Sequence, residues 1–159
     1  MASNAENAYE QLKATEGTDE GHGDWYQVTQ ATIDAFADLT HDHQFIHVDP
    51  EKAAALSPWK VTVAHGFLTL SMLTHLASSV PSSAGGRLEG LVMGMNYGFD
   101  KVRFVSPVKV ESRIRAQSTV KSVELKGDSL QVTKTYTVEI DGEERPALVA
   151  DWVTRLVFA

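Results

Sequence analysis

The sequence contains no cysteine, so a disulfide, a thiolate nucleophile and a cysteine-ligated zinc are all excluded. It also lacks any apolar run close to the roughly 20 residues that a helix needs to span a bilayer. Residues 1–7 show neither the basic start nor the apolar core of a signal peptide. We therefore expect a cytoplasmic protein without a membrane segment.

Positive charge is also scarce, since 14 basic residues face 21 acidic ones and the net charge is −7. Phosphate backbones demand a basic surface, so this balance argues against a nucleic-acid partner. Basic residues do cluster between positions 101 and 115, as Lys101, Arg103, Lys109, Arg113 and Arg115. Such a run can attract a phosphate-bearing small ligand, and it is equally typical of a solvated strand face.

A chain of 159 residues is about one domain long. The apolar spacing in residues 5–14 predicts a short amphipathic helix, and the polar stretch 15–23 predicts a loop or linker. Residues 1–23 are therefore assigned to an N-terminal helix and linker. Residues 24–159 are assigned to a single domain.

Two further helices are expected. Thr29 is placed to cap a helix that ends near Thr40, with Val28 and Ile33 forming a hydrophobic staple. The segment 41–59 has no period and contains two prolines, so it is predicted to be extended and irregular. Residues 66–77 carry apolar side chains on nearly every side, which predicts a helix that is buried on most sides.

The last third of the sequence alternates at period two, which predicts strands of an antiparallel sheet with one buried face. One predicted face includes Val108, Val110, Ile114 and Val120, and another includes Val132, Tyr136, Val138 and Ile140. Gly127-Asp128 and Asp141-Gly142 are predicted hairpin turns. The fold class is therefore α+β, with a curled antiparallel sheet wrapped around one buried helix.

The densest polar cluster lies at residues 40–50 (THDHQFIHVDP). On a continuous helix, Asp42 and His47 would lie about 140° apart around the axis. They can converge only if the helix ends near Thr40 and the chain turns back. A carboxylate beside an imidazole can bind one water and exchange a proton with it near neutral pH. From the spacing alone, a polar loop with solvated histidines is the simpler interpretation.

Gly66 stands at the start of the apolar helix. The N-terminus of a helix has unpaired N–H groups, and a glycine there lets a ligand approach the backbone closely. Such an N–H group could stabilise a carbonyl oxygen that gains negative charge. Taken alone, a glycine that simply permits tight helix packing is the better explanation of this residue.

Three runs in this order resemble the MaoC-like dehydratases, which include (R)-specific enoyl-CoA hydratases and NodN-like proteins. They are residues 36–49 (FADLTHDHQFIHVD), 63–71 (VAHGFLTLS) and 96–104 (NYGFDKVRF). The resemblance extends from about Trp25 to the C-terminus. The common motif has Gly, Asn and Pro where this sequence has His41, Gln44 and Phe45, which bears on the loop geometry and the acyl-chain preference.

The resemblance implies a hotdog fold, a homodimer and reversible hydration of a trans-2-enoyl-CoA to a (3R)-hydroxyacyl-CoA in fatty acid metabolism. It implies that Asp42 and His47 are the catalytic pair and that Gly66 is the backbone oxyanion donor. Lys101 and Arg103 are candidates to bind the CoA phosphates. The reaction needs no metal and no redox cofactor, and CoA is part of the substrate.

Three alternatives compete with this interpretation. A hotdog acyl-CoA thioesterase would hydrolyse the same class of substrate, and a non-catalytic acyl-CoA binding module would bind it without turnover. A metal site could instead use His41, His43, His47 and Asp49, because imidazoles suit zinc.

Overall fold

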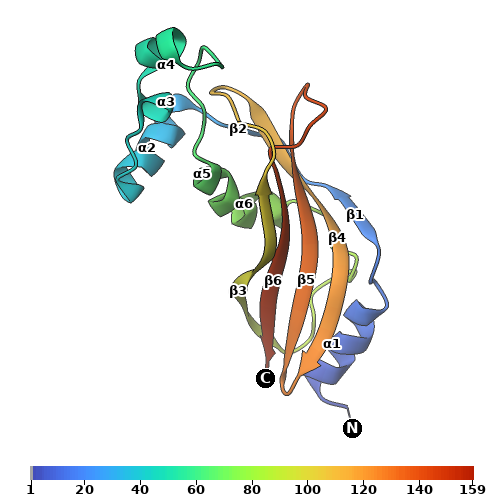
Figure 1. The fold of residues 1–159 in the computed structure, drawn as a ribbon. Coiled ribbons are helices and arrows are strands. Elements are labelled where there is room, and N and C mark those ends of the chain that lie inside the picture. The colour runs from blue at the N-terminus through green and yellow to red at the C-terminus, as the bar shows by residue number, and fades with distance from the viewer. Residues whose placement is uncertain (1) are drawn as a thin grey trace.

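The main layer of the protein is an antiparallel β-sheet of six strands (Figure 1). The computed structural model describes residues 2–159. The strands are β1 (Asp19–His22), β2 (Tyr26–Gln27), β3 (Leu91–Phe104), β4 (Arg113–Lys126), β5 (Ser129–Ile140) and β6 (Leu148–Phe158). Their order is β1-β4-β5-β6-β3, and β2 also pairs with β4. β3 therefore forms one end of the sheet.

The helices lie in three groups around this sheet (Figure 1). They are α1 (Asn4–Lys13), α2 (Gln30–Thr40), α3 (Phe45–Val48), α4 (Pro50–Leu56), α5 (Gly66–Ser71) and α6 (Leu73–Ser78). α2, α3 and α4 gather beyond one end of the sheet, and α1 lies near the other end. α5 and α6 connect the first group to one face of the sheet.

The core lies between α6 and this face of the sheet. Leu73 and Leu76 of α6 are each 1% exposed, and they belong to the same buried cluster as Ile114, Val138 and Leu148. Burial of one leucine side chain contributes about 2 kcal/mol to stability, so these contacts fix α6 to the sheet. The predicted α+β class is confirmed, with an antiparallel sheet packed on a helix.

The alternation predicted for β5 is confirmed. Val132, Tyr136, Val138 and Ile140 are all buried. The turn predicted at residues 127–128 joins β4 to β5, with positive φ at its glycine. The predicted strand over 108–120 was wrong at its start, because Glu111 has φ of 66° and β4 begins only at residue 113.

The predicted central helix over 66–77 also needs correction. It consists of α5 and α6, which are separate segments joined at Met72. It is not buried on most sides, since Phe67 is 68% exposed while Leu68, Leu73 and Leu76 are buried. The sheet covers one side of the two helices, and their other apolar side chains remain accessible in a single chain.

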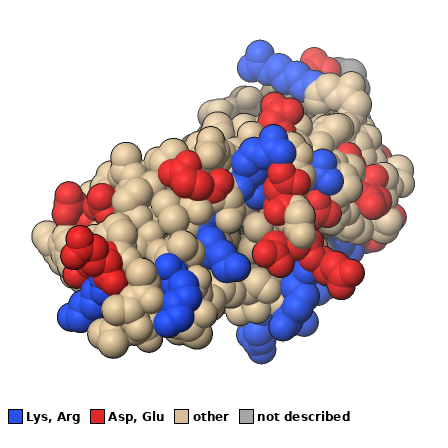
Figure 2. Space-filling view, turned by 90° about the horizontal axis from the view of Figure 1, so that it is seen from above, with Lys and Arg blue, Asp and Glu red and all other residues tan. Residues whose placement is uncertain are grey.

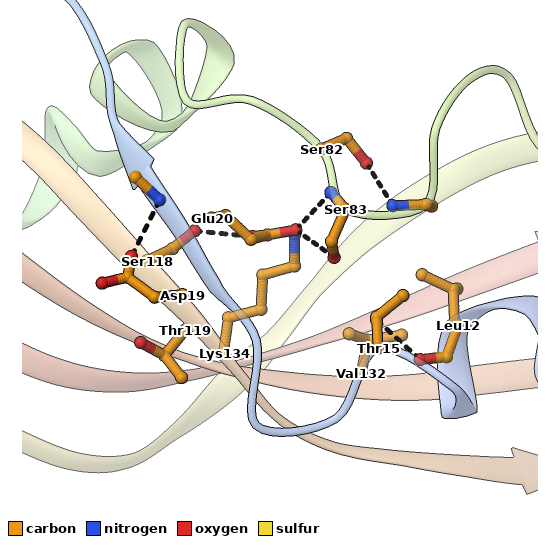
Figure 3. A network of polar contacts seen from close by, with 12 residues as sticks. Leu12, Thr15, Asp19, Glu20, Ser82, Ser83, Ser118, Thr119, Val132 and Lys134 are labelled. Carbon is orange, nitrogen blue, oxygen red and sulfur yellow. Dashed lines mark hydrogen bonds and ion pairs between the residues drawn. The ribbon is translucent and has the colours of Figure 1, made fainter.

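The prediction of a loop over 15–23 was wrong for β1, which pairs with β4. Its buried side chain is not apolar but is Glu20, so no hydrophobic alternation marks the strand. The Glu20 carboxylate accepts hydrogen bonds from Ser118 Oγ, from Ser83 N and Oγ, and from Lys134 Nζ at 2.7 Å (Figure 3). Burial of a carboxylate is tolerated because it is paired and hydrogen-bonded.

The prediction of an irregular segment over 41–59 was wrong in part, because this segment contains two short helices, α3 and α4. The Asp49 side chain accepts a hydrogen bond from the Lys52 backbone N–H, and Pro50 takes the first helical position of α4. Proline is well tolerated there, because that position has no intrahelical N–H bond to lose.

No helix within residues 2–159 is long and apolar enough to cross a membrane. The division of the chain into residues 1–23 and residues 24–159 stays a prediction.

Candidate active site

The end of α2 directs the chain toward the site. The Thr29 side chain accepts a hydrogen bond from the Thr32 N–H, which confirms the predicted N-cap. α2 ends at Thr40, and His41 adopts the left-handed conformation with φ of 60°. This residue reverses the chain, so Asp42 lies in a turn rather than on the helix. The helix end that Asp42 and His47 require is therefore confirmed.

His47 lies in the single turn of α3 and is only 7% exposed. Its Nδ1 is 2.6 Å from the carbonyl oxygen of Val63. A carbonyl can only accept, so Nδ1 donates and carries the hydrogen. In the neutral ring, Nε2 is then the nitrogen that can accept a proton. The backbone carbonyl of His47 accepts a hydrogen bond from Gln30 Nε2 at 2.7 Å, which ties α3 to α2.

The surroundings of His47 favour the neutral ring. Burial lowers the pKa of His47 below its usual value, and the neighbouring His65 lowers it further. The Val63 carbonyl and the Asp42 carboxylate act in the opposite direction and do not outweigh these effects. The ring is therefore able to take a proton at neutral pH.

Asp42 and His47 are brought together as predicted. A side-chain ligand atom from each of Asp42, His47 and His65 lies within 4.8 Å of the other two. Asp42 is exposed and His47 is buried. A carboxylate and an imidazole this close together can share one bridging water.

Gly66 is the first residue of α5, and its N–H has no hydrogen-bond acceptor among residues 2–159. A Cβ atom at Gly66 would lie 2.9 Å from Cδ1 of Phe104, so a larger residue would require that ring to move. Gly66 and His47 both line a cavity of about 250 Å³, together with Trp59, Thr69 and Phe104. A free N–H and a free imidazole nitrogen thus belong to residues that border one cavity.

The same three side chains raise the question of a metal, because Asp42, His47 and His65 offer types of ligand that metals use. The rings of His47 and His65 are stacked, with centroids 3.8 Å apart and planes only 23° apart. A metal ion lies near the plane of each imidazole that binds it, so these two rings cannot converge on one ion as they stand. The arrangement does not fit a metal centre.

The alternative metal set predicted from the sequence is not assembled in the described part of the chain. His43 Nε2 pairs with Asp38 at 2.8 Å on the surface, and Asp49 caps α4. Only His47 of that set belongs to the Asp42 group.

The structure separates the basic residues from the cavity. Lys101 lies opposite Asp151 in the register of β3 against β6, while Phe99 and Val102 pack against the core on the other face of the sheet. Lys101 and Arg103 therefore point away from the face that α6 covers. Their role with CoA phosphates stays a prediction.

The other basic residues have different neighbours. Arg113 pairs with Asp141, and Arg115 pairs with Glu139 at 2.8 Å. Both guanidinium groups also lie over the ring of Trp25. Acidic and basic side chains are interspersed on the face in Figure 2, without a broad patch of either sign.

No role was predicted for His65 or Gln30 from the sequence. His65 Nε2 lies 3.0 Å from the backbone oxygen of Asp42, and its ring stacks on His47. Gln30 links the Thr62 hydroxyl to the His47 carbonyl through its two amide atoms. For His65 a signal existed, since it stands beside Gly66. The sequence contains no such signal for Gln30, which resembles an ordinary polar residue in the first turn of α2.

Comparisons with known proteins identify the family of the chain. The family described as "MaoC like domain" matches residues 11–141. Nodulation protein N of Rhizobium leguminosarum bv. viciae is 51% identical over 144 residues, covering 89% of this chain and 86% of that protein. The 3-hydroxyacyl-thioester dehydratase Z of Mycobacterium tuberculosis is 44% identical over 147 residues, covering 92% and 93%.

A solved structure shows the same fold. The (R)-hydratase from A. caviae, which is involved in PHA biosynthesis, superposes with a TM-score of 0.62 at 25% identity and covers 83% of this chain and 93% of its own. The fold is therefore the predicted hotdog fold. With a family match over most of its length and two relatives above 40% identity, this chain belongs to the MaoC-like dehydratase family.

Proposed function

We propose that the protein is an (R)-specific enoyl-CoA hydratase, a hydro-lyase that interconverts trans-2-enoyl-CoA and (3R)-hydroxyacyl-CoA. One observation carries the proposal: the Asp42 carboxylate lies within 4.8 Å of a ring nitrogen of His47, and His47 shares a cavity with Gly66. The name of the related 3-hydroxyacyl-thioester dehydratase supports the reaction class. The solved (R)-hydratase supports the stereochemistry.

The residues suit the proton movements of this reaction. Asp42 and His47 would bind one water between them, and neutral His47 would take its proton through Nε2. The water oxygen bonds to the β-carbon, and the electrons of the double bond move toward the thioester carbonyl. The α-carbon then receives a proton from the same pair, so one water is added in total.

Gly66 has a separate role in this proposal. Negative charge develops on the thioester oxygen as the enolate forms, and the unpaired Gly66 N–H can donate to it. The helix start adds a favourable partial positive charge. The steps move protons only, so the proposal needs no metal and no redox cofactor.

The test is loss of enoyl absorbance with crotonyl-CoA and longer trans-2-enoyl-CoAs. We expect Asp42→Asn and His47→Gln to lower kcat by about 10²–10⁴-fold, because each removes a proton-transferring group. Circular dichroism and gel filtration check that both variants stay folded. Lys60→Gln, on an exposed loop residue outside the site, is the control.

Different outcomes would favour the competing functions. Release of free CoA thiol without loss of the enoyl group would indicate a thioesterase. Binding of CoA thioesters without turnover at any chain length would indicate a binding module. Normal turnover by Asp42→Asn would remove that residue from the mechanism.

We also propose that the protein forms a homodimer through β3. This strand is the end of the sheet and pairs only with β6 among residues 2–159. Several of its exposed side chains are large and apolar, among them Val92 at 60% and Tyr97 at 63% exposure. A long apolar edge strand tends to pair with another chain. By contrast, the net charge of −7 and the mixed surface in Figure 2 do not suit nucleic acid.

A further inference from the structure

His65 contacts all three residues of the proposed site. It immediately precedes Gly66 and is only 3% exposed. Its Nε2 lies 3.0 Å from the backbone oxygen of Asp42. Its ring stacks on that of His47 with centroids 3.8 Å apart. The ring of Phe36, at 5.0 Å, also packs against it.

The hydrogen bond of the His65 ring defines the tautomer of the neutral imidazole. The Asp42 carbonyl can only accept, so Nε2 carries the hydrogen. In the neutral ring Nδ1 then has a lone pair, and this buried atom has no partner among residues 2–159. A buried polar atom without a partner is unfavourable for stability. Packing alone would be served better by an apolar side chain, so the residue type indicates another role.

The turn that carries Asp42 has few other contacts. The Asp42 carboxylate accepts from the Gln44 N–H at 3.4 Å, which is a long bond, and the residue itself is exposed. The adjacent His43 interacts only at the surface, with Asp38. The partly buried bond from His65 therefore joins this turn to the start of α5.

We propose that His65 is a positioning residue, which fixes the Asp42 turn through its Nε2–H and orients His47 through its ring. Both contacts come from the residue next to Gly66, so His65 sets the spacing between the carboxylate, the imidazole and the backbone donor. The kinetic part of this inference rests on the proposed hydratase function. An error of about 1 Å in such spacing can lower a rate by about 10²-fold.

Two substitutions separate the two contacts. His65→Phe keeps a ring that can stack on His47 but removes the donor to Asp42. His65→Gln keeps a donor that can reach the Asp42 carbonyl but removes the ring. His75→Phe is the matched control, because His75 is an exposed histidine of α6 outside the site.

With crotonyl-CoA, we expect His65→Phe to lower kcat about 10²-fold while KM changes little, because the substrate-binding cavity remains. His65→Gln should recover part of this loss, because it restores the donor but not the ring, and His75→Phe should match the wild type. A kcat of His65→Phe equal to that of the wild type would overturn the proposal. Equal losses in both His65 variants, explained by a lower Tm, would also overturn it and leave a purely structural role.

A second measurement does not depend on turnover. Backbone amide NMR signals of residues 42–44 report on the turn, and we expect them to shift and exchange faster in His65→Phe than in His65→Gln. If the wild type proves inactive but these signals change as expected, the proposed function fails and the positioning role stands. If the signals are the same in both variants and the wild type, the positioning role fails whatever the activity.

Discussion

The Nδ1 atom of His47 donates a hydrogen bond of 2.6 Å to the carbonyl of Val63, three residues before Gly66. Val63 itself forms an isolated antiparallel β-bridge with Lys109, outside the strands of the sheet, and its N–H donates to the Ile46 carbonyl. One short extended segment therefore fixes the imidazole and leads directly into the helix start. The tautomer of His47 and the place of Gly66 follow from the same backbone.

This bond and the burial of His47 predict the pH dependence of activity. Burial is the main cause that lowers the pKa of His47 below its usual value of about 6.5. If neutral His47 accepts the proton, kcat/KM should fall only when the pH drops below about 6.5. Initial rates with crotonyl-CoA between pH 5 and pH 8 test this. A midpoint above 6.5 would contradict the assignment of His47 as the group that titrates.

The same shift predicts how His47 affects stability. Its pKa is lower in the folded than in the unfolded state, so the unfolded chain binds the proton more readily as the pH falls. The contribution of His47 is therefore fully present above about pH 6.5 and is lost as the pH falls toward the folded-state pKa. Urea unfolding at pH 7.5 and at pH 5.5 should show a smaller loss for His47→Gln than for the wild type. Equal losses would contradict the lowered pKa.

The buried ion pair in Figure 3 predicts a large effect of a single substitution. The Glu20 side chain is 1% exposed and lies 2.7 Å from Lys134 Nζ. Lys134→Met leaves the carboxylate buried without its counter-charge, which should lower the free energy of unfolding by about 3 kcal/mol. Adding Glu20→Gln should recover part of this loss, because the amide carries no charge. Urea midpoints measure both, and a double variant less stable than Lys134→Met would contradict the account.

The pKa of Glu20 adds a pH test of the same pair. Burial raises it, but the hydrogen bonds from Lys134, Ser118 and Ser83 outweigh burial and lower it overall. A carboxylate with a lowered pKa stabilises the fold above its unfolded pKa, and this stabilisation is lost as the pH falls through the folded-state pKa. Glu20→Gln should therefore flatten the loss of stability below about pH 4.5.

Sequence patterns predicted the parts of the fold that local chemistry decides. The alternation in residues 132–140, the Thr29 cap and the end of α2 follow from period, capping and the loss of period. β1 could not be predicted in this way, because its buried residue is Glu20 and its partner Lys134 is 114 positions away. The exposure of Phe67 was missed because a helix apolar on most sides does not reveal which sides the sheet covers.

For the site, spacing and resemblance identified Asp42, His47 and Gly66, while the contacts that hold them remained hidden. The bonds of Gln30 and His65 to this site join residues 17 and 23 positions apart. Contacts of that separation depend on how the elements pack. The placement of Lys101 and Arg103 was likewise decided by the register of β3 against β6, which alternation alone does not fix.

The edge of β3 predicts the assembly. Val92 and Met95 are exposed apolar residues on this strand. If two copies pair along β3, Val92→Lys combined with Met95→Lys should shift the 17.4 kDa chain from dimer to monomer, because charges on an edge strand oppose pairing. Leu125→Lys is the control, since Leu125 is similarly exposed but lies on β4. Sedimentation equilibrium distinguishes the two states, and a persistent dimer in the double variant would exclude β3 as the interface.

The backbone conformation of His41, which directly precedes Asp42, predicts a stabilising substitution. His41 has φ of 60° and ψ of 23°, a left-handed conformation that costs an L-residue roughly 1–2 kcal/mol. Glycine adopts it without this cost but loses about 0.5–1 kcal/mol through the greater freedom of the unfolded chain. His41→Gly should therefore raise the free energy of unfolding by about 0.5–1 kcal/mol.

Thr40→Gly is the matched control for this substitution, because Thr40 is the last right-handed residue of α2. There glycine brings only the entropic cost and loses the Thr40 hydroxyl bond to the Phe36 carbonyl, so stability should fall. Urea unfolding of the two variants separates the effect of backbone conformation from that of glycine itself. Because His41→Gly preserves the backbone path into Asp42, its kcat should stay near that of the wild type. Destabilisation by both substitutions would show that the His41 side chain stabilises the turn more than its conformation strains it.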